Sequence, residues 1–61
     1  MPIVRVEWMP GRTREQKAAL AKAITESVVT IGRVEPKGVF VVFDERPAED
    51  WAAGGVLEAD W

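Results

Sequence analysis

The chain has no histidine, no cysteine and no tyrosine among its 61 residues. Histidine and cysteine are the side chains that most often shuttle protons or act as nucleophiles near neutral pH, so an enzyme built from this sequence must use other groups. Without cysteine there are no disulfide bonds, and without histidine or cysteine a zinc ion lacks its usual ligands. We therefore expect no metal site.

Basic character and long apolar runs are also missing. Eight Lys and Arg residues against ten Asp and Glu give a net charge of −2, which argues against nucleic-acid binding. No apolar run approaches the roughly 18 residues of a membrane span, and no signal-peptide pattern opens the sequence. We expect a soluble cytoplasmic protein that binds neither nucleic acid nor membranes.

The chain is also short, and residues 1–61 are expected to form one domain. Chains of this size bury only about 60% of their unfolded surface and usually need disulfides, a metal or subunit contacts for stability. Yet 48% of the residues are hydrophobic, and three are tryptophans, Trp8, Trp51 and Trp61. Because so much apolar surface needs a partner, we predict self-association.

What is present is a proline at the second position. Initiator Met1 is usually removed when the next residue is small, which would leave Pro2 as a free secondary amine. An α-amino group titrates near about 8, far closer to neutrality than lysine at about 10.4. Pro2 is then the best-placed base in the chain. If Met1 is retained, the Pro2 nitrogen is an amide with no basicity.

The first segment, residues 2–9, is predicted to be a strand because apolar residues alternate along it. The turn dipeptide Pro10-Gly11 ends it. One face of the strand carries Val4, Val6 and Trp8, and the other carries Ile3, Arg5 and Glu7.

A helix is predicted from Arg14 to Ile31. Thr13 lies three residues before Gln16, the spacing of a capping box, and Gly32 is expected to end the helix in the left-handed conformation. Apolar residues form one stripe at helical spacing, and charged residues off the stripe are expected in solvent. The stripe consists of Leu20, Ile24, Val28 and Ile31, and the solvated residues include Lys17, Lys22 and Glu26.

A second strand is predicted at residues 39–43, after a short turn at Pro36. This run is apolar on both faces, so both need covering: the helix covers one, and a second subunit must cover the other. A helix that connects two strands makes them parallel. Residues 44–50 are expected to be a loop, and residues 51–57 a short hairpin with positive φ at Gly54 and Gly55.

The sequence resembles the 4-oxalocrotonate tautomerase family over nearly its whole length without a gap. The likeness rests on four segments: Pro2-Ile3-Val4, Gly11-Arg12-Thr13, Glu15-Gln16-Lys17 and Trp51-Ala52-Ala53-Gly54-Gly55. It implies an α+β fold, a β-α-β tautomerase-type subunit with parallel strands and a short C-terminal hairpin. Such subunits pair into dimers with a four-stranded sheet, and three dimers commonly form a hexamer.

The resemblance also implies roles for single residues in a cofactor-free enzyme. Pro2 matches the general base, which moves a proton on a small enol or unsaturated 2-keto acid. Arg12 matches the arginine that binds the substrate carboxylate, although by itself it reads as a solvated turn residue. Trp51 matches an aromatic that walls the site, or it packs an interface. An apolar pocket and a nearby cation lower the pKa of an amine, which suits such a base.

Phe40 departs from the family pattern. It stands where the best-known tautomerases carry a second arginine, donated from a neighbouring subunit to the keto-acid end of the substrate. Losing such a donor costs about 2.7–4 kcal/mol in the transition state, so we expect poor turnover of the dicarboxylate 2-hydroxymuconate. We expect the preferred substrate to be an enol with one carboxylate, or an aryl enol stacked on Phe40 and Trp51. The other cations considered as substitutes for this arginine are Arg5, Arg33, Lys37 and Arg46.

Two alternatives remain open. In the first alternative, the chain is one subunit of a hetero-oligomer, in which a partner supplies the missing arginine. Or it resembles relatives that hydrate or dehalogenate 3-haloacrylates, but the position of their water-activating glutamate is Ala53 here. Asp50 or Glu49 would then have to reach the site.

Overall fold

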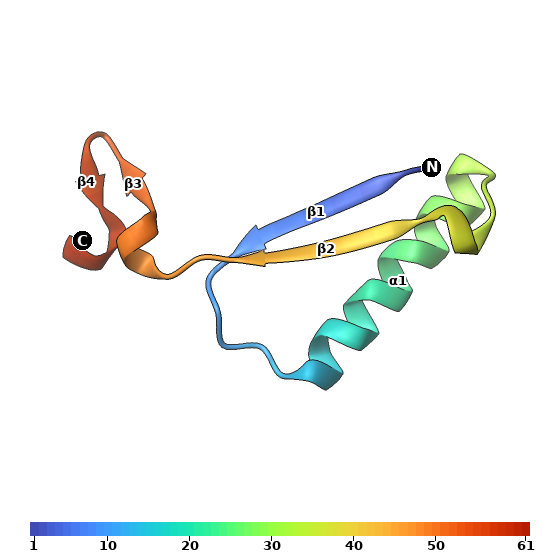
Figure 1. Cartoon of the computed structure of the whole chain (residues 1–61), viewed down its shortest axis with the longest axis horizontal. Helices are drawn as coiled ribbons and strands as arrows, with labels where there is room; N and C mark the ends of the chain where they lie inside the picture. The colour runs from blue at the N-terminus through green and yellow to red at the C-terminus, as the bar shows by residue number, and fades with distance from the viewer.

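The computed structural model describes all residues from Met1 to Trp61 and confirms the β-α-β unit with a trailing hairpin (Figure 1). The strands are β1 (Ile3–Trp8), β2 (Phe40–Glu45), β3 (Ala52–Ala53) and β4 (Val56–Leu57), and the helix is α1 (Arg14–Gly32). Short 3-10 turns occur at η1 (Pro36–Gly38), η2 (Ala48–Asp50) and η3 (Glu58–Asp60). No helix combines the length and the apolar character needed to cross a membrane.

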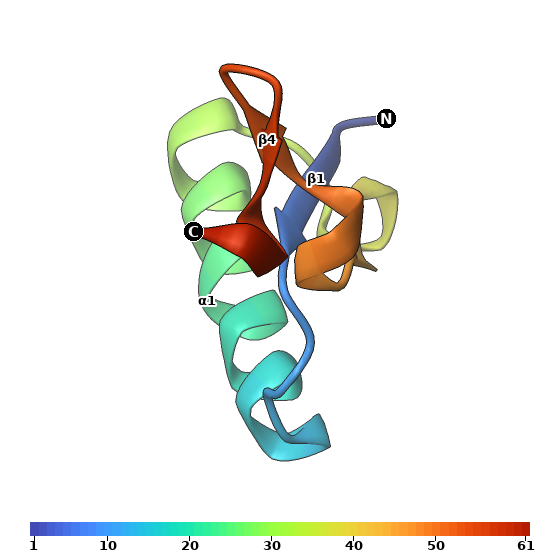
Figure 2. The ribbon, with the colours of Figure 1, turned by 90° about the vertical axis from the view of Figure 1, so that its left-hand side faces the viewer.

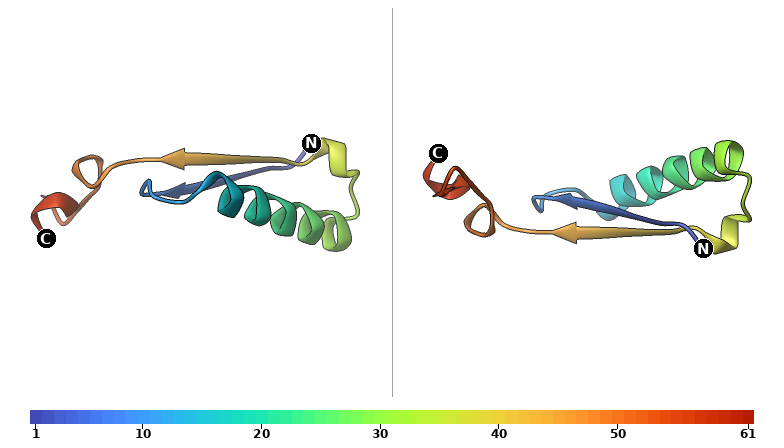
Figure 3. Two further views of the ribbon diagram at one scale, coloured as in Figure 1. Left: turned by 90° about the horizontal axis from the view of Figure 1, so that it is seen from below. Right: turned by 90° about the horizontal axis from the view of Figure 1, so that it is seen from above.

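β1 and β2 form a parallel two-stranded sheet, in which Ile3 pairs with Phe40 and Trp8 pairs with Glu45. Exposure alternates along β1 as the sequence predicts, because every second side chain points toward α1. In both views of Figure 3, α1 follows one face of the sheet and no other helix or strand follows the opposite face. We call that opposite side the bare face, formed by Ile3, Arg5, Glu7, Phe40, Val42 and Asp44.

β2 begins one residue later than predicted, at Phe40, and ends two residues later, at Glu45, where its charged side chains are paired. The apolar run stops at Phe43, but Asp44 and Glu45 continue the ladder. Asp44 accepts a hydrogen bond of 3.2 Å from Arg46 Nη2, and Glu45 Oε1 lies 3.0 Å from Lys17 Nζ. Lys17 was expected in solvent, and this was wrong: it is half-buried and ties α1 to the end of β2.

The amino end of α1 forms the predicted capping box. The Gln16 N–H donates to Thr13 Oγ1 at 3.1 Å, and the Thr13 N–H donates to Gln16 Oε1 at 2.9 Å. These bonds satisfy backbone donors that the first helical turn leaves without partners. The box therefore fixes where the loop after β1 turns into α1.

Thr13→Ala is expected to lower the free energy of unfolding by about 1 kcal/mol, because it removes the acceptor for the Gln16 N–H. Urea denaturation at one fixed chain concentration measures the change. Thr30→Ala, at an exposed position near the other end of α1, is the matched control and should change stability much less. Equal effects of the two substitutions would contradict the capping role.

The carboxyl end of α1 differs from the prediction at two residues. Gly32 remains helical, and Arg33 is the left-handed residue, with φ 57° and ψ 55°. The Arg33 N–H donates to Val29 O at 2.9 Å, which closes the last turn one residue later than expected. Ile31 is 83% exposed, contrary to its predicted place on the buried stripe. Its turn reaches past the amino ends of both strands, where there is no sheet to pack against (Figures 1 and 3).

Residues 46–61 form an arm that extends away from the β-α-β unit (Figure 1). Its β3–β4 hairpin turns at Gly54 and Gly55, whose φ values of 60° and 83° confirm the predicted turn. The arm is held by its own bonds: the Trp51 indole donates to Arg46 O at 3.0 Å, and the Trp61 indole donates to Val56 O at 3.2 Å. Figure 2, viewed from the side of the arm, shows α1 flanking the sheet behind it.

The single chain has no fully buried residue. Its radius of gyration is 14.7 Å, whereas a compact chain of this length has about 10–11 Å. On the bare face Ile3 is 57% and Phe40 47% exposed, and on the arm Trp61 is 72% exposed. So much apolar exposure indicates that further chains complete the hydrophobic core.

Candidate active site

Pro2 and Phe40 lie side by side at the amino end of the sheet. The Phe40 N–H donates to Pro2 O at 2.9 Å, so the strand pairing itself begins at these two residues. The Phe40 side chain shares the bare face with Ile3, its partner in the ladder. The backbone of Pro2 therefore adjoins the apolar end of the bare face, where Ile3 and Phe40 lie.

Arg12 and Trp51 lie beyond the other end of the sheet. Arg12 follows β1 in the loop that leads to α1, and Trp51 follows β2 after η2. The six residues of β1 span about 20 Å at 3.3 Å per residue. Within one chain, Pro2 and Phe40 thus lie at one end of the sheet, and Arg12 and Trp51 lie beyond the other end.

The side chain of Arg12 is held in place without an acidic partner. Its guanidinium carbon lies 4.4 Å from the centroid of the Trp8 ring, and its Nη1 donates to Met9 O at 3.0 Å. None of the four ion pairs in the structure involves Arg12. An ordered cation with unused N–H donors is a suitable receptor for a carboxylate.

Arg5 and Arg46, two of the cations considered as substitutes for the missing arginine, are already engaged on the bare face. Arg46 contacts Asp44 at 3.2 Å and Glu7 at 3.6 Å, and Arg5 lies 4.0 Å from Asp44. Asp44 and Glu7 therefore already neutralise the positive charges of Arg5 and Arg46, which a substrate carboxylate would have to bind.

The other two, Arg33 and Lys37, lie at the Pro2 end, where α1 ends and η1 begins, and neither forms an ion pair. The segment from the end of α1 to η1, which carries them, lies at the end of the sheet where the chain begins (Figure 1).

The hairpin region offers few groups for chemistry. Ala53, at the position where a haloacrylate-type enzyme needs a carboxylate, pairs with Val56 in the β3–β4 ladder. Glu49 and Asp50 lie in η2, immediately before Trp51. No group of three or more His, Cys, Asp or Glu side chains is arranged to hold a metal ion.

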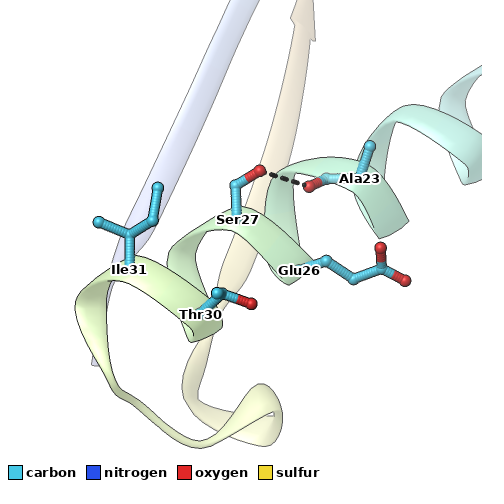
Figure 4. A pocket seen from close by; sticks show the side chains of 5 residues that line it. All are labelled: Ala23, Glu26, Ser27, Thr30 and Ile31. Carbon is cyan, nitrogen blue, oxygen red and sulfur yellow. Dashed lines mark hydrogen bonds between the residues drawn. The ribbon is translucent and has the colours of Figure 1, made fainter.

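The one hollow on the surface lies elsewhere. It is formed along α1 by Ala23, Glu26, Ser27, Thr30 and Ile31 (Figure 4). The only side-chain hydrogen bond at this hollow runs from Ser27 Oγ to the backbone carbonyl oxygen of Ala23, at 3.1 Å. All five come from one helix, and none is a predicted site residue. This hollow is not the place where Pro2 and Arg12 would act.

A family model described as "Tautomerase enzyme" matches residues 2–60, from Pro2 to the residue before the last. The chain belongs to the tautomerase family. A probable tautomerase from Ralstonia nicotianae is 40% identical over 57 residues, covering 93% of this chain and 88% of the relative. Membership confirms the resemblance and supports a tautomerase, that is isomerase, activity.

Solved tautomerase structures share the fold. YwhB, a homologue of 4-oxalocrotonate tautomerase, superposes with a TM-score of 0.90 at 30% identity, covering 98% of each chain. A heterohexamer 4-oxalocrotonate tautomerase from Chloroflexus aurantiacus J-10-fl gives a TM-score of 0.84 at 32% identity, covering 98% of this chain and 97% of that one. A tautomerase subunit of this shape is thus found within an assembly.

Sequence reasoning overlooked one feature of this tautomerase. Trp8 was assigned only to a strand face, yet its ring also supports Arg12. The alternation that put Trp8 on the α1 side gave no sign of this contact, because it depends on how the loop after β1 folds back. The only sign of this contact in the sequence is that Arg12 comes four residues after Trp8, an aromatic residue at the end of a strand.

Proposed function

We propose that this tautomerase interconverts the enol and keto forms of a small enol or unsaturated 2-keto acid, without a cofactor. Pro2 is the general base after removal of Met1, and Arg12 binds the substrate carboxylate. The observation that carries the proposal is the state of Arg12: an ordered guanidinium without an acidic partner, in a chain whose family match begins at Pro2. The chain has no histidine, cysteine or tyrosine to serve as the base instead.

The amino terminus is suited to this role. Met1 is 84% exposed, so its removal takes little from the packing of the chain. The freed amine takes the proton of the enol hydroxyl and, as an ammonium, returns a proton to carbon. Apolar surroundings disfavour the charged form of an amine, and Ile3 and Phe40 provide apolar side chains at the end of the sheet where Pro2 lies. A pKa close to the working pH lets one group do both steps.

Pro2 and Arg12 of one site come from two different chains. β1 pairs only with β2, so its other edge offers free N–H and C=O groups to a further strand. Two copies of β1 paired antiparallel around a two-fold axis place the amino end of each strand opposite the carboxyl end of the other. Pro2 of one chain then faces the loop that carries Arg12 of its partner. The relative that is a heterohexamer supports self-association, and three dimers in a hexamer remain a prediction.

Phe40 restricts the substrate to enols with a single carboxylate. It presents an exposed ring where a second cation would bind a second carboxylate, and its neighbours on the bare face, Ile3 and Val42, are also apolar. Such a surface favours an aryl or alkyl substituent at the end of the substrate remote from Arg12. We therefore propose an aryl-substituted 2-hydroxyacrylate, the enol of an arylpyruvate, as a better substrate than 2-hydroxymuconate.

Phe40→Arg is expected to raise kcat/KM for 2-hydroxymuconate at least tenfold, because it restores a donor worth about 2.7–4 kcal/mol in related sites. The same change should lower or leave unaltered kcat/KM for phenylenolpyruvate. Absorbance assays of both enols give the ratio, and Phe40→Leu is the control that loses the ring without gaining a charge. An unchanged ratio in Phe40→Arg protein of normal assembly size would refute the substrate assignment.

A second candidate is a subunit that works only with a different tautomerase chain. The heterohexamer relative favours it, since its own assembly contains unlike subunits. The purified chain distinguishes the two: a self-sufficient enzyme forms a homo-oligomer that ketonises phenylenolpyruvate, whereas a hetero-oligomer subunit is inactive alone.

A further inference from the structure

Arg12 belongs to a column of three side chains at the carboxyl end of the sheet. Its guanidinium carbon lies 4.4 Å from the centroid of the Trp8 ring. On the sheet, Trp8 stacks with Phe43, with ring centroids 5.4 Å apart and planes inclined by 15°. The Arg12–Trp8–Phe43 column therefore connects the middle of β2 to the loop that carries the candidate substrate-binding residue.

The column leaves the guanidinium partly occupied and partly free. The Trp8 ring covers one face, and Met9 O accepts from Nη1 at 3.0 Å. A guanidinium has five N–H donors, so most remain available. Two acids at this end pair with other cations: Glu45 with Lys17, and Glu7 with Arg46. No acid forms an ion pair with Arg12.

Trp8 is held by packing alone, since its buried indole N–H has no hydrogen-bond partner. It is half-buried on the α1 side of the sheet, and its ladder partner Glu45 is tied to α1 by the 3.0 Å contact with Lys17. The loop beyond it contains Gly11 at φ 132°, a conformation that side-chain-bearing residues rarely adopt, and ends at the Thr13 cap. The platform and the backbone on both sides of Arg12 are thus fixed before substrate arrives.

We propose that Trp8 is a positioning residue, whose indole face holds the guanidinium of Arg12 ready for the substrate carboxylate. The inference rests on the proposed role of Arg12. A long arginine side chain in an exposed loop would otherwise have to be ordered on binding, and that ordering costs affinity. The cation–π contact removes this cost from the binding step.

Trp8→Leu is expected to raise KM for phenylenolpyruvate roughly 3- to 30-fold, the range of a lost cation–π contact. Because the carboxylate is bound equally in the ground and transition states, kcat should stay within about twofold. Trp8→Phe, which keeps a ring with a weaker face, should give a smaller rise in KM. A neutral ester of the same enol cannot form an ion pair with Arg12, so its KM should change little in either variant.

Two further variants separate positioning from packing. Phe43→Leu removes the ring under Trp8 but not the face under Arg12, so it should lower the unfolding temperature and leave KM nearly unchanged. In an Arg12→Ala background, Trp8→Leu should add nothing to KM, since the contact is already gone.

The outcomes are distinct. Additive effects of Trp8→Leu and Arg12→Ala, or an equal rise in KM for Phe43→Leu, overturn the positioning role. A KM unchanged in Arg12→Ala alone refutes instead the proposed function of Arg12. If Trp8→Leu fails to assemble, the ratio of acid to ester KM in Trp8→Phe decides: a ratio equal to that of the unaltered protein overturns the inference.

Discussion

A chain that keeps any group in front of Pro2 is expected to lose enol-ketonising activity by about 10²–10⁴-fold, the usual contribution of a general base. Acylation turns the proline nitrogen into an amide, whose lone pair is delocalised and accepts no proton. No other group takes over, because the chain lacks histidine, cysteine and tyrosine. The loss should appear in kcat, since Arg12 still binds the carboxylate.

The measurement compares one protein in two forms. A chain with a short amino-terminal extension is assayed before and after a protease releases Pro2 as the first residue, and intact mass verifies each form. A chain with the same extension at the carboxyl end is the control and should stay active. Equal activity of the extended and released forms would show that Pro2 is not the base. Pro2→Ala, which keeps a primary α-amino group, should lose less activity than the extended chain.

Local features of the fold were predictable from the sequence because neighbouring residues determine them. The Thr13 and Gln16 cap and the Gly54-Gly55 turn follow from spacing and residue type alone. The errors arose where distant segments decide. Lys17 is drawn from solvent by Glu45, and Ile31 is exposed because its helical turn passes the end of the sheet.

The helix stop was misjudged for a related reason. Gly32 has no side chain and could adopt a left-handed conformation easily, but α1 continues through it. Arg33, the next residue, takes the left-handed conformation instead. Residue type indicates that a helix will end here. The register of the last hydrogen bonds, here Arg33 N–H to Val29 O, decides at which residue.

The identities of the candidate site residues came from the family resemblance, and their arrangement came from the structure. Pattern and spacing could not reveal the backbone hydrogen bond between Phe40 and Pro2, or the cation–π contact between Arg12 and Trp8. The distance between Pro2 and Arg12 follows from the length of β1 once that strand is known to be regular. Because of this distance, we place the proposed site at an interface between chains and not within a single chain.

Mixing two variants that are each impaired at a different residue tests this shared site most directly. One variant is capped at Pro2 and keeps Arg12, and the other has a free Pro2 and carries Arg12→Ala. The first lacks the base, and the second lacks the charge-assisted bonds to the substrate carboxylate, so each should lose at least about tenfold in kcat/KM. The two are unfolded together, refolded and assayed, with each variant refolded alone and the unaltered protein as controls.

If Pro2 and Arg12 of one site come from different chains, random assembly joins an intact Pro2 to an intact Arg12 in about a quarter of the sites. The mixture should then recover about a quarter of the unaltered activity, in assemblies of the same size. If both residues of a site came from one chain, no combination of the variants would restore a complete site. A mixture no more active than its separate components would contradict the two-chain site.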